Sequence, residues 1–252
     1  MSHEQRYRPW GGELAADPMT ALDAVAWPAV PSPAVAVVLP LGSTEQHGPH
    51  LPFDTDTAVA VELARGLAGA RPDLVLAPPL GYGASGEHEG FPGTLSMGCE
   101  ALELVLVELG RSAARWAQRF LILNGHGGNL APLAAAVRQL RYEGRDAAYW
   151  SPTIPAGDAH AGRTETSLML AVRPTAVRPL SAIAGPTDPL SDLLPRIQAA
   201  NLAAVSPSGV LGDPSGASTQ EGERLLGELR ADLDAAVGRW LAGGPGGRLT
   251  AG

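Results

Sequence analysis

Short apolar runs alternate with amphipathic segments along most of this chain, and this alternation constrains the fold more than any other feature. The first run, AVAVVLPL, is rich in valine and bounded by proline and glycine, as buried strands usually are. Strands that alternate with helices form a mostly parallel sheet covered by helices on both faces, so we expect an α/β fold. The pattern predicts strands at 34–41, 74–77, 120–124 and 147–150, and helices at 55–68, 100–118, 130–142, 165–172 and 221–241.

The length of the chain and its apolar content favour a single domain over residues 1–252. With 252 residues, of which 45% are hydrophobic, the chain can bury a sizeable core. The sequence contains no internal repeat and no linker long enough to divide it. We expect an N-terminal extension over about 1–30, a flexible tail over 243–252, and ordered loops in the Pro/Gly/Ser-rich stretches 184–195 and 206–219.

The charged residues and the single cysteine exclude several classes of protein. All 18 basic residues are arginine, so no lysine can form a Schiff base, bind phosphate in a Walker loop or pair with a catalytic serine. Cys99 alone cannot build a cysteine-rich zinc site or an intrachain disulfide. The net charge of -8 argues against nonspecific nucleic-acid binding. Because no signal segment or membrane-spanning run is visible, we expect a cytoplasmic protein that binds no membrane.

Polar side chains collect in the loops that follow the predicted strands. In open parallel sheets, ligands bind beyond the carboxyl ends of the strands, so a site is expected in these loops. Of the six histidines only His3 lies elsewhere, and carboxylates are interleaved with the other five. A lone loop histidine is usually structural, but five together favour a shared function; they are His47, His50, His88, His126 and His160.

Histidine mixed with carboxylate is typical of a site for zinc, manganese or iron. Glu45 and His47 are two residues apart, so in an extended segment both face the same side. Asp56 follows near the start of a helix, where its carboxylate can bridge two ions. His126 lies in a glycine-rich loop that lets a ligand approach closely. Five or so ligands exceed what one four-coordinate ion uses, so the pattern allows a pair of ions about 3.5–4 Å apart.

Structural roles compete for several of these residues. Asp56 can cap the helix that follows it, and Glu165 can complement the dipole at the start of its own helix. Glu87 and Glu89 are typical of solvated loop charges, and His50 of a hydrogen-bonded turn residue. The residues alone leave these roles open.

Four separated motifs resemble the creatininase (creatinine amidohydrolase) family over about residues 30–175. They are GSTEQHGPHLP at 42–52, FPGT at 91–94, NGHGGN at 124–129 and HAGRTETS at 160–167. This resemblance implies a three-layer α/β/α sandwich, a centre of one or two divalent metal ions, and hydrolysis of amide C–N bonds, often in cyclic amides. It also implies a homo-oligomer, in particular a hexamer.

The resemblance assigns roles to individual residues. His160 matches a catalytic histidine beside the metals, and Asp56 matches the ligand that bridges them. Creatininase itself has a glutamate ligand two residues after the histidine of the third motif, and here that position is Gly128. Glu165 is the expected substitute. The positions that match the family's metal ligands are Glu45, His47, Asp56 and His126.

Segments 157–170 and 205–214 resemble one branch of the family, peptidases that release a C-terminal Val-Tyr-derived unit from a modified precursor peptide. In the expected reaction a metal-activated water attacks the scissile carbonyl while Glu45 or Glu165 orients it. His160 then protonates the leaving amine and His88 contacts the substrate. The alternatives are a small-molecule amidohydrolase acting on creatinine or a formamide, and a metal-stabilised binding protein without turnover.

Overall fold

The computed structural model describes residues 20–251 and contains one six-stranded sheet in that range. The strand order is β1-β3-β2-β4-β5-β6, and every neighbouring pair is parallel. The expected α/β fold with a parallel sheet is therefore confirmed. The strands are β1 (Thr20–Ala21), β2 (Ala36–Leu41), β3 (Leu74–Leu76), β4 (Arg119–Asn124), β5 (Asp146–Trp150) and β6 (Gly247–Arg248).

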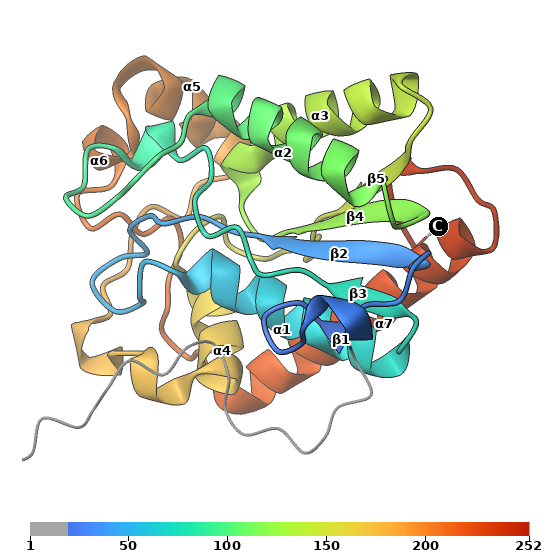
Figure 1. Ribbon diagram of the computed structural model, residues 1–252. Helices are drawn as coiled ribbons and strands as arrows, with labels where there is room; N and C mark the ends of the chain where they lie inside the picture. Colours follow the sequence, from blue (N-terminus) through green and yellow to red (C-terminus); the bar gives the residue numbers. More distant parts are fainter. Residues whose placement is uncertain (1–19, 252) are drawn as a thin grey trace, which may run out of the picture.

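Helices cover both faces of this sheet, which gives three layers. They are α1 (Thr55–Ala70), α2 (Cys99–Ala113), α3 (Leu130–Tyr142), α4 (Arg163–Val172), α5 (Leu190–Ala200), α6 (Leu202–Val205) and α7 (Thr219–Leu241). In Figure 1, α2 and α3 lie above the sheet, whereas α1, α4 and α7 lie below it. Among residues 20–251, no helix combines the length and the apolar character needed to cross a membrane.

Successive strand residues contribute to two separate cores. In β2, Ala36 and Val38 pack toward α1 and α7, whereas Val37 and Leu39 pack toward α2 and α3. The residues of β4 alternate in the same way. Because both faces of the sheet are covered, every residue of β2 is buried, which explains the near-continuous apolar run in the sequence.

The longest helix, α7, begins and packs as its local sequence predicts. The hydroxyl oxygen of Ser218 accepts a hydrogen bond from the backbone N–H of Glu221 at 3.2 Å and so caps the helix. One stripe of α7 is buried against the sheet and against α1 and α4. This stripe consists of Leu225, Leu226, Leu229, Leu233, Ala236, Val237 and Trp240.

Two stretches differ from the sequence prediction. The stretch 184–195, expected to be a loop, includes the start of α5, because Leu193 and Ile197 lie one turn apart and bury themselves in a small separate core with α6. The flexible tail expected over 243–252 is also wrong in part, because Gly247 and Arg248 pair with β5. The backbone N–H of Leu249 donates to the Tyr149 carbonyl at 2.8 Å, and Leu249 is buried.

Two further segments end or begin at positions other than those predicted from the sequence. The helix predicted over 100–118 ends at Ala113, because the chain turns there so that the backbone N–H of Gln118 donates to the Ala34 carbonyl at 2.9 Å. The N-terminal extension expected over about 1–30 lies largely outside the described residues. Within it, Thr20 and Ala21 pair with β3.

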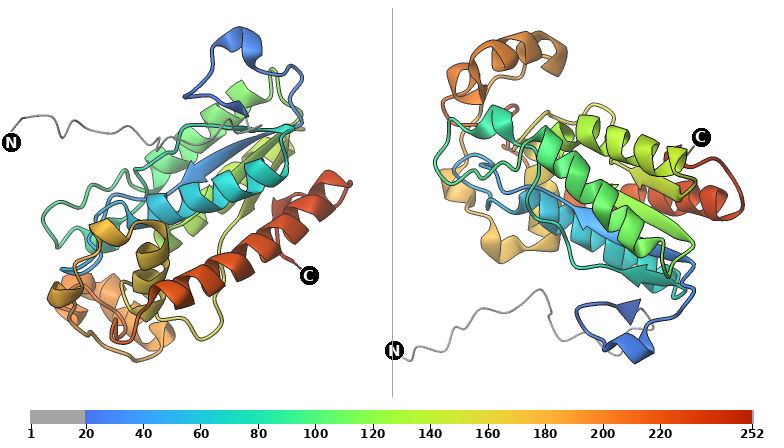
Figure 2. Two further views of the ribbon diagram at one scale, coloured as in Figure 1. Left: turned by 90° about the horizontal axis from the view of Figure 1, so that it is seen from below. Right: turned by 45° about the horizontal axis from the view of Figure 1, so that its top comes forward.

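The carboxyl ends of β2, β4 and β5 meet at one end of the sheet, since these strands are neighbours and parallel. Figure 2 shows α5 and α6 standing beyond that end, away from the layers that cover the sheet. The loops that leave the three strands therefore lie between the sheet and α5.

Candidate metal centre

The site residues predicted from the sequence converge at the carboxyl end of the sheet. They come from the loop after β2 (Glu45, His47), the first turn of α1 (Asp56), a short 3₁₀ helix (His88), the loops after β4 (His126) and β5 (His160), and the first turn of α4 (Glu165).

Asp56 lies between two histidines. Its Oδ1 is 3.1 Å from His47 Nε2, and its Oδ2 is 3.3 Å from His126 Nδ1. The hydroxyl of Ser43 donates a hydrogen bond to Oδ2 at 2.6 Å. These contacts turn the carboxylate toward the imidazoles rather than toward the first N–H groups of α1. The geometry therefore favours a ligand role for Asp56 over a capping role.

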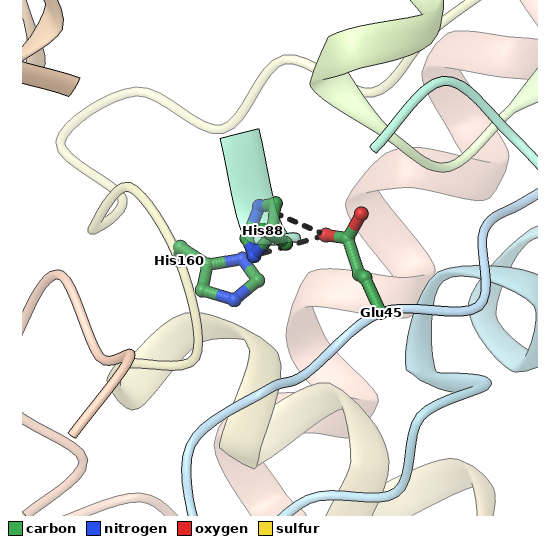
Figure 3. Close-up of side chains that lie close together, drawn as sticks. All are labelled: Glu45, His88 and His160. Atoms are coloured by element: carbon green, nitrogen blue, oxygen red, sulfur yellow. Dashed lines mark ion pairs between the residues drawn. The ribbon is translucent and has the colours of Figure 1, made fainter. Parts of the chain in front are cut away.

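Glu45 is a fully buried carboxylate that forms no hydrogen bond. Among the described residues, neither of its oxygens has a hydrogen-bond partner. His126 Nε2 lies 3.1 Å from Oε2. His88 Nε2 and His160 Nδ1 lie 3.3 and 3.9 Å from Oε1, as Figure 3 shows for these three side chains. A buried charge without hydrogen bonds is costly unless another charge compensates it. This carboxylate, with imidazole nitrogens turned toward it, therefore fits a divalent cation.

Glu165 approaches the same cluster from the start of α4. Its Oε2 is 3.8 Å from His47 Nε2 and accepts the backbone N–H of Ala161 at 2.6 Å. The side chain is 25% exposed, so it also faces open space. Glu165 therefore faces the cluster rather than lying solvated on α4, and its carboxylate could hold a metal ion there.

The donor atoms form three overlapping sets, each with all its atoms within 4.8 Å of one another. Imidazole and carboxylate together suit a divalent metal of the zinc, iron or manganese type. The sets are Glu45, Asp56 and His126; His47, His160 and Glu165; and Glu45, His88 and His160.

Opposite charges within the cluster shift the pKa values of its members. Burial raises the pKa of Glu45, but interactions with His126 and His88 together outweigh it and lower that pKa to about 2. Burial lowers the pKa of His47, but the Asp56 carboxylate raises it to about 10. Burial raises the pKa of Glu165 to about 7, although His47 opposes this shift. The pKa of His126 is also raised, so without a cation His47 and His126 are the histidines that balance the carboxylates.

Sequence reasoning missed Gln46 and misjudged Glu87. Gln46 lies between two residues expected to face the site, so alternation pointed it away, yet its buried side chain contacts His88 and His160. Glu87, expected to be solvated, has its Oε1 3.6 Å from His126 Nε2 and lines the cavity beside the cluster. No local pattern signals either position.

His50 lies outside the donor sets, as the turn interpretation predicts. Its Nε2 is 2.9 Å from the hydroxyl of Thr166, so it links the loop after β2 to α4. The residue is fully buried.

A cavity of about 780 Å³ opens beside the cluster. One side is formed by the cluster itself, including His88, His126, His160 and Glu165. None of the described residues that line it is an arginine. The apolar part of the lining comes mainly from α5 and α6, with one leucine each from α3 and from the loop before α7: Leu190, Leu194, Ile197, Leu202, Leu130 and Leu211.

Comparison with known proteins places this arrangement in a family. Residues 23–237 match the family model for creatininase, described as creatinine amidohydrolase. The chain belongs to the creatininase family. The match spans all the site residues named above, so the resemblance seen in the sequence is confirmed.

Relatives in this family have two kinds of name. A "mycofactocin precursor peptide peptidase" from Mycolicibacterium smegmatis is 53% identical over 81% of this chain and 85% of its own length. A protein of the same name from Mycobacterium ulcerans is 47% identical over 99% of both chains. The creatinine amidohydrolase of Pseudomonas putida is 30% identical over 75% of this chain and 84% of its own.

Solved creatininase structures share the fold. A creatininase mutant complexed with creatine superimposes with a TM-score of 0.75, at 26% identity, over 88% of this chain and 99% of that one. A structure named "Creatininase Mn" gives a TM-score of 0.73 at 25% identity, over 88% of this chain and 99% of that one. With the donor sets described above, these relationships make this creatininase-family chain a hydrolase of amide bonds with a divalent-metal centre.

Proposed function

We propose that this chain is a metal-dependent peptidase that releases the C-terminal Val-Tyr-derived unit from the modified mycofactocin precursor peptide. The names of the relatives at 53% and 47% identity support this substrate. The observation that carries the proposal is the cavity of about 780 Å³ beside the donor sets. A cavity of this size suits a drug-sized group, whereas one small cyclic amide would leave most of it empty.

The wall formed by α5 supports an apolar substrate group next to the scissile bond. Leu190 and Leu194 lie one helical turn apart, face the cavity and are 42% and 40% exposed. Leu193 and Ile197 anchor the same helix on α6. An apolar group bound here would remove the exposed leucine surface from water, which is favourable.

The residues that would hold the metal are the cluster members with inward-facing oxygen and nitrogen atoms. A bound divalent ion lowers the pKa of its water toward about 7, so it supplies hydroxide at neutral pH. Glu165 would provide the carboxylate that creatininase itself has at the position of Gly128. One or two ions of zinc, iron or manganese would be held by Glu45, His47, Asp56, His126 and Glu165.

Three side chains of this protein would act on the substrate. His160 is nearly buried, its Nδ1 faces Glu45, and it would protonate the leaving amine. The carboxylate of Glu165 reaches the cavity and would orient the attacking water. His88 lines the same cavity and would bind the substrate beside the scissile carbonyl.

Incubation of the metal-loaded protein with two substrates tests the proposal. The modified precursor peptide and creatinine are offered separately, and products are identified by mass spectrometry. We expect release of the C-terminal unit from the peptide and no ring opening of creatinine. Cleavage of creatinine or of a formamide alone would instead establish a small-molecule amidohydrolase. Turnover of none of these substrates by metal-loaded protein would favour a metal-stabilised binding protein.

We also propose a homo-oligomer, in particular a hexamer, as the family resemblance implies. Trp27, Leu104 and Tyr142 are large side chains with 85%, 61% and 88% of their surface exposed. Apolar surface of this kind is available for contacts between subunits. Sedimentation equilibrium of the full chain measures the subunit number, and a monomer would contradict the proposal.

A further inference from the structure

The side chain of Gln46 joins several separate segments of the site. It is buried, and its amide nitrogen Nε2 lies 2.9 Å from His88 Nδ1, 3.1 Å from His160 Nε2 and 3.1 Å from the carbonyl oxygen of Gly209. Its amide oxygen accepts the backbone N–H of Gly48 at 2.8 Å. One carboxamide thus touches both histidines that line the cavity without belonging to the expected ligand set.

The hydrogen atoms of this carboxamide can be assigned from its partners. Because Gly48 donates to the oxygen, the other end must be the NH₂ group, which has two hydrogens. The Gly209 carbonyl can only accept, so it takes one of them. His88 Nδ1, at 2.9 Å, takes the second. His88 Nδ1 therefore carries no hydrogen, and the neutral ring carries it at Nε2.

His160 must also be the Nε2–H tautomer. Its Nε2 lies 2.9 Å from the backbone carbonyl oxygen of Gln46, which can only accept a hydrogen bond. The hydrogen of the neutral His160 ring therefore lies on Nε2, and Nδ1 keeps its lone pair. The 3.1 Å contact with the amide nitrogen then carries no hydrogen bond, since both amide hydrogens are used elsewhere.

We propose that Gln46 is a positioning residue that holds both His88 and His160 as the Nε2–H tautomer, while the two rings turn different nitrogens toward Glu45. His88 then presents an N–H at Nε2, 3.3 Å from Glu45 Oε1, whereas His160 presents an unprotonated Nδ1, 3.9 Å from the same oxygen. One ring can only donate a hydrogen bond and the other can accept a proton. This assignment removes His88 from the candidate metal ligands and makes His160 a proton acceptor before it becomes a donor.

Gly209 is the backbone feature that permits this arrangement. Its φ is +77°, and a Cβ at this position would lie only 1.9 Å from the amide oxygen of Gln46. Any side chain there would displace the carboxamide. The loop that carries Gly209 therefore helps to position the Gln46 carboxamide, although it contributes no side chain to the cluster.

Tautomers can be read directly by NMR. The full-length zinc-loaded protein is labelled with ¹⁵N-histidine, and ring nitrogens with and without hydrogen are distinguished in long-range ¹H–¹⁵N spectra, with assignment by single histidine variants. In the unaltered protein we expect hydrogen on Nε2 of both rings. In Gln46→Glu, a carboxylate oxygen replaces the NH₂ group, so we expect His88 to carry hydrogen at Nδ1 while His160 keeps its tautomer.

Measurements of activity and metal content on the Gln46→Glu variant show whether Gln46 positions the two histidines or only supports the fold. The kinetic part rests on the proposed function; the tautomers do not, so they decide this inference even if the substrate is another amide. We expect Gln46→Glu to lower kcat by about 10–100-fold with little change in KM. The zinc content and the melting temperature of Gln46→Glu should equal those of the control variant Gln118→Glu, in which the substituted residue is exposed. An unchanged His88 tautomer in Gln46→Glu, or loss of activity only together with zinc, would overturn the proposal.

Discussion

The carboxylate of Glu87 occupies the space that a side chain on Gly128 would need. A Cβ on Gly128 would lie 2.7 Å from Glu87 Oε1 and 2.3 Å from the carbonyl oxygen of Ala84. Both separations are far below normal contact distances. The backbone here therefore excludes the glutamate that creatininase itself has at this position, so a carboxylate that replaces it would have to reach the cluster from elsewhere.

Substitution of Gly128 tests this crowding. Gly128→Ala should destabilise the fold by about 1–3 kcal/mol, because the backbone carbonyl of Ala84 cannot move out of the way as a flexible side chain could. Thermal unfolding measures the effect. Gly227→Ala is the matched control, since that glycine lies within α7 with open space around it and should gain up to about 1 kcal/mol. Equal effects at both positions would contradict the crowding.

Metal analysis of two variants identifies the source of the substitute carboxylate. Glu165→Gln should lower the number of ions bound per chain, because Glu165 belongs to a donor set with His47 and His160. Glu87→Gln should retain the full complement, because Glu87 belongs to none of the donor sets among the described residues. Mass spectrometry of the metal content decides between them, and the reverse pattern would assign the ligand role to Glu87.

A second pair of variants distinguishes a metal ligand from a residue that transfers a proton. His126→Ala should lose metal and activity together, since His126 contacts both Glu45 and Asp56. His160→Ala should keep its metal and lose about 10²–10⁴-fold in kcat, the usual contribution of a positioned acid or base. Metal content is measured beside turnover of the same samples. Metal-free unaltered protein with full activity would refute the scheme.

Substrate selection by α5 is testable at Leu194. Leu194→Asp places a charge on the apolar wall of the cavity, so KM for the peptide should rise at least about tenfold while metal content stays constant. Leu180→Asp is the control, because Leu180 is fully exposed and does not line the cavity. A normal KM in the Leu194 variant would exclude this wall as the binding surface.

The pH dependence of stability should differ between metal-free and metal-loaded protein. In metal-free protein, Asp56 raises the pKa of His47 to about 10, so the His47 charge stabilises the fold fully below its ordinary pKa of 6.5. This contribution is lost as pH rises toward 10. A metal-bound imidazole is neutral, so the loaded form lacks this loss. Melting temperatures between pH 7 and 10.5, with and without chelator, should diverge as pH rises, and parallel curves would contradict this.

Local sequence patterns were sufficient for the layered architecture. Apolar runs of four to eight residues could be recognised as strands because burial on both faces makes every position apolar, as in β2. The helix α3 has the predicted bounds. The helix α7 begins at Thr219, two residues before the predicted start and directly after its cap Ser218. The loops after these strands, and hence the residues at the carboxyl end of the sheet, followed from the same patterns.

Short elements could not be recognised because their stability comes from distant partners. β6 consists of two residues, Gly247 and Arg248, which are ordered by pairing with β5 about a hundred residues earlier. α5 follows a stretch rich in proline and contains Pro195, so local propensity argues against it, yet Leu193 and Ile197 bury themselves against α6. In both cases tertiary contacts outweigh the local preference.

The sequence by itself determined which residue types are available at the end of the sheet, because strand periodicity and loop position are local properties. Only the tertiary structure decided how their atoms meet: that Glu87 lies beside Gly128, and that Gln46 contacts a histidine 114 residues away. Such contacts depend on the packing of whole helices and strands at ångström precision, since a hydrogen bond is lost when its atoms separate by a fraction of their contact distance. No pattern of neighbouring residues encodes that separation.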